Sequence, residues 1–274
     1  MHISRIDNII SDLEQASDIL SKWFIDNYLK ANPDKYHLLL SETSETQLIV
    51  ENVPIASSCC EKLLGIKIDH KLSFEPHVES LCKKASQKLN ALARLTSSLK
   101  FKQRKLLLNA FITAQFSYAP AVWMFHSRKL NNRINHIHER ALRLVYKDYT
   151  SSFDELLLKD NSFRIHHRNL QKLAIEIFKV KLGIAPQIMK NVFPIIDNPY
   201  NLRNETKFKS RNVDTVRYGI ETASFVAPRI WSSIPRNCKE CSSANEFKAK
   251  IKFWYPENCP CKLCKNYIYQ IGYT

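Results

Sequence analysis

A helical repeat of apolar residues begins at Glu75 and limits what this chain can fold into more than any other feature. Apolar side chains recur every three or four residues, the spacing that places them on one face of an α-helix. With its breaks, the repeat predicts helices over residues 75–99, 102–125, 129–147, 153–158 and 165–182. Each apolar face must be covered by another element, so the pattern predicts a helical bundle.

The chain on either side of this repeat has a more mixed pattern. Residues 3–29 have helical spacing, and Asn32-Pro33 ends that helix. Short strands are then predicted over residues 37–40, 47–50 and 62–68. Beyond residue 182, the pattern predicts a loop over residues 183–210, a partly extended segment over 216–231 and a short helix over 244–253. The predicted fold class is mainly α, with a small N-terminal α+β part, a helical bundle and an irregular C-terminal tail.

Glycine is scarce, with only Gly65, Gly183, Gly219 and Gly272 among 274 residues. The dinucleotide fingerprint, the Walker A loop and the nucleophile elbow need clustered glycines, which bring backbone close to a phosphate or allow a strained turn. The sequence therefore excludes these three kinds of site. It also contains no H-E-x-x-H motif and no triad signature that would indicate an independent catalytic activity.

The positive charge is concentrated in one quarter of the chain. Residues 1–82 carry 7 basic and 13 acidic groups, whereas residues 83–147 carry 14 basic groups and one acidic group, Glu139. Residues 148–274 carry 20 basic and 12 acidic groups. A run of lysines often forms only a solvated helix face, but such a face is more stable with mixed signs of charge. The surplus over three predicted helices favours a surface that binds the phosphate backbone of a nucleic acid.

Residues 106–125 carry no charge, and this stretch is long enough to cross a membrane. Asn109, Gln115 and Pro120 within it are costly or awkward in hydrocarbon, and the mean hydropathy of the chain is −0.31. We therefore expect a buried core helix and no membrane partner. The first twelve residues contain no apolar signal-peptide core, so an intracellular, reducing compartment is expected, with nucleus and cytoplasm both open.

Five of the eight cysteines lie near the C-terminus at metal-ligand spacing. A Cys-x₂-Cys pair and a Cys-x-Cys-x₂-Cys run are separated by seventeen residues, within the range of tetrahedral zinc sites. The candidate zinc ligands are Cys238, Cys241, Cys259, Cys261 and Cys264. Five thiols compete for four positions, so either member of the first pair completes the set, and free thiols remain the alternative.

Residues 109–149 read NAFITAQFSYAPAVWMFHSRKLNNRINHIHERALRLVYKDY. This run resembles the thumb of the reverse transcriptases of non-LTR (LINE-type, jockey-like) retrotransposons. Residues 21–40 contain a W-F-x-x-N-x-L-K-x-N-P-x-K pattern similar to the polymerase D motif, and residues 62–78 resemble the E motif, or primer grip. Four further segments resemble the tail of the same proteins: residues 153–186, 200–204, 215–235 and 254–273, the last of which includes the C-P-C-x-x-C run.

The resemblance implies three parts: the end of a palm at residues 1–75, a helical thumb-like domain at 76–182, and a tail at 183–274. In that family, a palm aspartate and an Asp-Asp pair hold the two catalytic Mg²⁺ ions, and this chain contains no Asp-Asp dipeptide. We therefore expect a truncated C-terminal portion of an RNA-directed DNA polymerase with no catalytic residue and no resident magnesium. Lys35 matches the D-motif lysine, a general acid in a complete polymerase, although an inert loop lysine is favoured here.

A thumb grips the template–primer duplex through its phosphates, so cations should dominate the contact. The expected partner is the backbone of RNA, an RNA–DNA hybrid or DNA, and no small-molecule substrate is indicated. Tyr118, Trp123 and Phe125 would stack on bases, but their spacing favours the core. The candidate nucleic-acid-binding residues are Lys83, Lys84, Lys88, Lys100, Lys102, Arg104, Lys105, Arg128, Lys129, Arg133, Arg140 and Arg143.

Two other interpretations remain open from the sequence. One is a stand-alone helical module that binds a protein or a nucleic acid and has a zinc-clasped C-terminus. The other is a non-functional relic of a decayed element that folds poorly. Binding to an RNA–DNA hybrid would argue against a module whose partner is a protein. A cooperative unfolding transition would argue against the relic.

Overall fold

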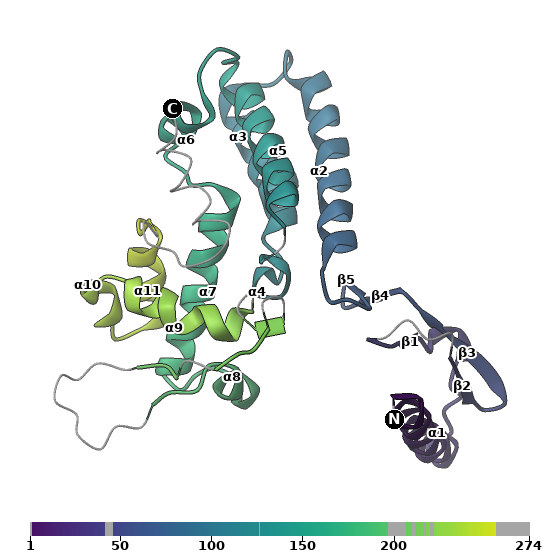
Figure 1. Ribbon diagram of the computed structural model, residues 1–274. Coiled ribbons are helices and arrows are strands. Elements are labelled where there is room, and N and C mark those ends of the chain that lie inside the picture. The colour runs from purple at the N-terminus through teal and green to yellow at the C-terminus, as the bar shows by residue number, and fades with distance from the viewer. Residues whose placement is uncertain are drawn as a thin grey trace. The chain divides into compact units, whose positions relative to one another are not determined.

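The structure is a computed structural model that describes residues 2–41, 46–125, 127–196, 207–209, 212–215, 218–219 and 222–255. It divides into two compact units, Met1–His77 and Val78–Thr274. The described residues are mainly helical, and all of their strands lie in the first unit (Figure 1). This confirms a mainly α chain with a small N-terminal strand region.

The first unit combines one long helix with short strands. Helix α1 spans His2–Asp26, close to the predicted range, and a 3-10 turn, η1, follows at Pro33–Lys35. Strand β3 (Val53–Ser58) lies between β1 (Leu38–Leu39), which is parallel to it, and β2 (Gln47–Val50), which is antiparallel. Strand β2 has the predicted bounds, whereas β3 was not predicted.

The strand predicted over residues 62–68 is wrong, because this segment contains a reversal of the chain. It forms a hairpin of β4 (Cys60–Leu63) and β5 (Ile66–Asp69). Leu64 and Gly65 form the two-residue turn, with φ values of 48° and 88°. Both values lie in the left-handed region that short hairpin turns need, and glycine adopts it without a steric cost. Because only two residues separate β4 from β5, the apolar residues of the two strands look like the pattern of one continuous strand.

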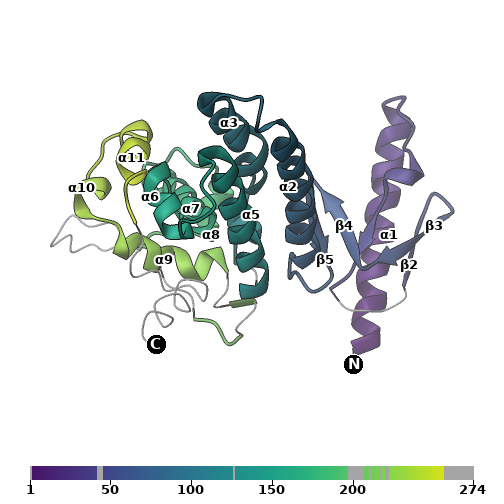
Figure 2. The ribbon, with the colours of Figure 1, turned by 90° about the horizontal axis from the view of Figure 1, so that it is seen from above.

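Most helices of the second unit lie where the periodicity predicts them. Helix α2 covers Glu75–Leu95, α5 covers Arg128–Tyr146, α6 covers Phe153–Asp160 and α7 covers Ile165–Lys181. Figures 1 and 2 both show α2 running alongside α5. A capping box between Ser152 and Glu155 starts α6, since each side chain accepts from the other's backbone amide.

The helix predicted over residues 102–125 is wrong, because the segment is broken into four short pieces. These are α3 (Phe101–Leu107), a π-helical turn η2 (Leu108–Ile112), a 3-10 turn η3 (Thr113–Phe116) and α4 (Pro120–Trp123). A residue before proline is disfavoured in the right-handed helical region, and Ala119 has a left-handed conformation instead. No helix within the described ranges is long and apolar enough to cross a membrane.

The C-terminal part contains more helix than its sequence pattern predicts. The predicted loop 183–210 contains α8 (Gln187–Val192), and the predicted extended segment 216–231 contains the start of α9 (Ala223–Ser233). Helix α10 (Arg236–Lys239) follows, and α11 (Ala244–Ile251) confirms the last predicted helix. Helix α9 forms despite an internal proline because five of its side chains are buried.

An aromatic cluster forms the core between α7, α9 and α11. Phe178 of α7 and Phe247 of α11 are stacked, with ring centroids 4.1 Å apart and planes at 7°. Trp231 of α9 lies 6.3 Å from the Phe178 ring and 6.5 Å from the Phe247 ring. All three side chains are buried. Long-range packing of these rings therefore holds the C-terminal helices against α7.

Candidate nucleic-acid interface

Helices α2 and α5 each bury one face and expose cations on the rest of their surface. On α2, Val78, Cys82 and Ala85 are fully buried, while Lys83 and Lys84 are exposed. Burial raises the pKa of the Cys82 thiol to about 11, and the positive charge of Arg133 on α5 acts against that rise.

Exposed basic side chains of α5 form a stripe along one face. Lys129, Arg133, His136 and Arg140 are spaced by four, three and four residues, which aligns them on an α-helix, and all four are exposed. The stripe spans about 16 Å, roughly the axial length of five nucleotides in one strand. It therefore matches the repeat of a phosphate backbone better than a single anion.

Eight of the twelve candidate cations are exposed, and no carboxylate within the described ranges forms an ion pair with them. These eight are Lys83, Lys84, Lys100, Lys102, Arg128, Lys129, Arg133 and Arg140. Their charge is available to a polyanion without the loss of an existing ion pair.

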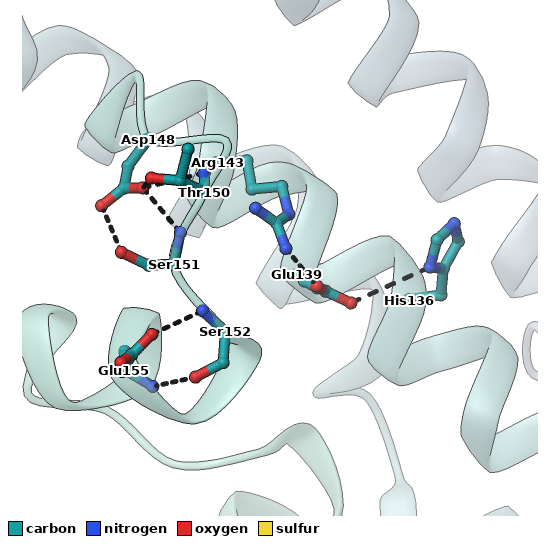
Figure 3. A network of polar contacts seen from close by, with 8 residues as sticks. All are labelled: His136, Glu139, Arg143, Asp148, Thr150, Ser151, Ser152 and Glu155. Atoms are coloured by element: carbon teal, nitrogen blue, oxygen red, sulfur yellow. Dashed lines mark hydrogen bonds and ion pairs between the residues drawn. The ribbon is translucent and has the colours of Figure 1, made fainter.

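Glu139 is the single acidic residue between residues 83 and 147, and it pairs with a cation of its own helix. Glu139 Oε1 lies 2.7 Å from Arg143 Nη2, and Glu139 Oε2 lies 3.9 Å from His136 Nδ1. Figure 3 shows the carboxylate between these two side chains. The charge of Arg143 is therefore paired, whereas the neighbouring Arg140 keeps its charge exposed.

The turn after α5 fixes the end of this helix. Asp148 accepts hydrogen bonds from the backbone amide of Ser151 and from its hydroxyl, at 3.1 and 2.8 Å, and pairs with Lys159 at 2.9 Å. These bonds, the one from Lys159 above all, lower the pKa of the Asp148 carboxyl. Figure 3 shows Asp148 and Ser151 together with the capping pair of α6. This network holds α5 and α6 in register without using any residue of the stripe.

Arg104 was predicted to bind nucleic acid, and the structure contradicts this prediction. Its side chain is buried, and its guanidinium donates to the carbonyl of Val145 at 2.9 Å and to that of Leu99 at 2.6 Å. A buried guanidinium must be satisfied by acceptors, because burying an unpaired charge is costly. Arg104 therefore joins α3 to the end of α5 and is not available to a phosphate.

Lys105 also differs from the sequence-based expectation. Its ammonium forms an ion pair with Asp160, whose side chain is only 2% exposed. The hydroxyl of Tyr146 donates to the same carboxylate at 2.9 Å. Burial, followed by Asp160, raises the pKa of this phenol to about 12. Lys105 therefore links α3 to α6.

Lys88, another candidate, is half-buried, and its ammonium lies over the Phe111 ring, 5.6 Å from the ring centroid.

His138 lies on the buried face of α5 beside this network. Its ring is 1% exposed, and its Nδ1 has no hydrogen-bond partner within the described ranges. Burial lowers its pKa to about 3, and the charges of Arg168, Lys105 and Arg164 add to this effect, whereas Asp160 acts against it. The folded chain therefore holds a neutral imidazole among cations.

This histidine predicts a loss of stability in mild acid. The unfolded chain binds a proton at His138 below pH ~6.5, but the folded chain does not until pH ~3, so stability falls as the pH drops from the first value. We expect the free energy of unfolding to decrease by about 2 kcal/mol between pH 7 and pH 5 from this residue. Urea unfolding at both pH values should show that His138→Leu removes this component. The matched control His136→Gln, on the exposed face of the same helix, should retain it.

The aromatic candidates separate into core and surface. Trp123 is buried, and its indole Nε1 donates to the carbonyl of Tyr118 at 2.9 Å, which confirms its predicted core position. Tyr118 is 57% exposed, contrary to the core prediction, and Phe125 is half-buried against the C-terminal cluster. Only the Tyr118 ring presents a broad surface to a base.

The structure adds two cations that were not among the candidates. Arg94 is exposed near the end of α2, at helical spacing from Lys83. Lys147 is exposed and ends α5 with a left-handed conformation, at φ 52°. Both lie in the basic quarter of the sequence, and helical spacing places Arg94 away from the apolar face of its helix, so charge and spacing could have identified it. The exposure of Lys147 depends on where α5 ends.

The proposed zinc ligands are only partly described. Cys238 and Cys241 are buried at α10, and burial raises the pKa of both thiols. Cys259, Cys261 and Cys264 lie outside the described residues. Within the described ranges, no group of three or more His, Cys, Asp or Glu side chains is arranged to hold a metal ion. The zinc hypothesis therefore stays a prediction.

Lys35 ends the short turn η1 in the first unit and is exposed. Its role as a general acid stays a prediction.

A scan against protein-family models, a search of curated proteins and a search of solved structures each found no match to this chain. A functional assignment therefore depends on the charge and geometry of its own residues.

Proposed function

We propose that this chain binds the sugar-phosphate backbone of nucleic acid through the exposed cations of α2, α3 and α5. The observation that carries the proposal is a group of eight exposed lysines and arginines with no carboxylate partner among the described residues. Within residues 83–147 the only acidic residue is Glu139, which pairs with Arg143, while Glu75 and Glu79 lie in the first turns of α2. Such a surface attracts a polyanion because binding releases the counterions condensed on its phosphates.

The family proposal is the thumb and tail of a reverse transcriptase from a non-LTR retrotransposon. It is supported by the resemblance of residues 109–149 and by the exposed charge of α5 within that run. A thumb holds a duplex by its shape and backbone, which requires cations and few groups that read bases. In this proposal the chain holds template and primer, while the carboxylates for metal-assisted nucleotide transfer belong to the palm. The cysteines of the tail would form its zinc site.

The salt dependence of binding tests this function. Contact with roughly six phosphates predicts a slope of log K against log[salt] of about −4 to −5 for an RNA–DNA hybrid. Removing two phosphate contacts with Arg133→Gln/Arg140→Gln should reduce the magnitude of the slope by about 2. Fluorescence anisotropy with a labelled hybrid, repeated over a salt series, measures both quantities.

A matched control separates a local interface from the effect of net charge. Lys190→Gln/Arg236→Gln removes the same two charges from exposed sites on α8 and α10. This variant should keep the slope of the unmodified chain. Binding that does not depend on salt, absent binding, or equal losses in both double variants would contradict the proposal and favour a protein-binding module.

A further inference from the structure

A second site is suggested by a cavity that lies apart from the basic stripe of α5. Its volume is about 610 Å³, within the range of pockets that hold small ligands. It is lined by residues of the segment 117–121, which leads from η3 into α4, by residues of α7, and by residues of the N-terminal half of α11. All of these elements belong to the second compact unit.

The polar lining of the cavity is dominated by lysines. Lys172 and Lys179, two turns apart on α7, and Lys248 on α11 all face it, whereas Glu176 is its only acidic residue. Glu176 pairs with Lys179 at 2.8 Å. This arrangement leaves a net charge of about +2, which matches a phosphomonoester dianion better than a carboxylate.

Lys172, one of the residues that line the cavity, is held by a backbone carbonyl. Its ammonium donates to the carbonyl of Ser117 at 2.9 Å. Burial, together with the charges of Arg168 and Lys248, lowers the pKa of this lysine. These positive charges repel one another. An anion bound between them offsets the repulsion and stabilises the charged form of each lysine.

The remaining lining suits an apolar group attached to the anion. Ala119, Pro120 and Ala121 from one wall and Leu173 and Ile175 from α7 supply this surface. The cavity is larger than a phosphate alone requires, and such mixed lining fixes a ligand that has one charged end and one flat or apolar end.

We propose that this cavity binds a phosphomonoester carried on a ring or another apolar group, with a nucleoside monophosphate as the simplest example. Lys172, Lys179 and Lys248 contact the phosphate, and the 119–121 segment contacts the apolar part. A free nucleotide and the 5′-phosphorylated end of a strand share this chemistry. The inference does not rest on the nucleic-acid interface, because it uses none of the exposed cations of α2, α3 or α5.

The test measures the binding of adenosine 5′-monophosphate and of adenosine to the full chain by isothermal titration calorimetry. We expect the monophosphate to bind and adenosine to bind at least about tenfold more weakly, because only the monophosphate offers charged acceptors to the lysines. Lys248→Glu should weaken monophosphate binding by about tenfold or more. Lys190→Glu, an equal charge change on α8, should leave it within about twofold.

A second arm distinguishes the source of the phosphate. A 5′-phosphorylated tetranucleotide that binds more tightly than its 5′-hydroxyl form, with the difference lost in Lys248→Glu, identifies a strand end as the ligand; equal binding of both forms identifies the free nucleotide. Thermal unfolding of each variant tests whether it is folded, and Lys179→Gln replaces Lys248→Glu if that variant is not. Equal binding of monophosphate and adenosine, equal effects of the two glutamate variants, or no monophosphate binding at millimolar concentration would overturn the proposal.

Discussion

Phe247→Ala is expected to lower the free energy of unfolding of the second unit by about 3–5 kcal/mol. The Phe247 ring is fully buried and lies between α7 and the C-terminal helices, stacked on Phe178 and close to Trp231. Its removal exposes the apolar surface of the neighbouring rings and leaves a cavity that a packed helical core fills only in part. Chemical unfolding followed by tryptophan emission measures the loss.

The control for this prediction is Phe253→Ala. Phe253 comes shortly after α11 but is 72% exposed, so its truncation should change stability by less than about 0.5 kcal/mol. Equal losses in the two variants would mean that the aromatic cluster is not the core of this part of the chain. The same buried cluster reaches the cavity, because Leu173 belongs to the cluster and also lines the cavity.

Asp160→Asn is expected to destabilise the second unit by about 3 kcal/mol. The carboxylate is nearly fully buried at the end of α6, where the helix dipole disfavours a negative charge. It is stabilised there by the ammonium of Lys105 and by the hydroxyl of Tyr146. Neutralising it leaves the Lys105 charge without its partner, and the desolvation already incurred by that charge is no longer offset.

A double-mutant cycle tests whether the pair acts as a unit. Lys105→Met/Asp160→Asn should lose less stability than the sum of the two single losses, because the second change removes the unpaired charge. Lys159, the residue before Asp160, is the control: its ammonium is 51% exposed in the ion pair with Asp148, so Lys159→Met should lose less than about 1 kcal/mol. Additive single losses would contradict a coupled buried pair.

Much of the second unit could be predicted because amphipathic periodicity reports burial directly. Helices α2, α5, α6 and α7 each bury one apolar stripe, and their ranges were predicted within a few residues. The method failed over residues 102–125, where a π-helical and a 3-10 turn keep apolar residues buried without the period of a straight α-helix. It failed again at α9, whose internal proline disfavours a helix locally while tertiary burial favours it.

By itself, the sequence determined that this chain is mainly helical and that its largest surplus of positive charge lies between residues 83 and 147, because both properties depend on residue type and local spacing. The tertiary structure decided which of those cations face solvent. Arg104 finds its acceptor 41 positions away and Lys105 its carboxylate 55 positions away. Such pairs depend on how helices pack, and the local pattern of a helix does not encode its neighbours. The cavity between α7 and α11 was hidden from the sequence for the same reason.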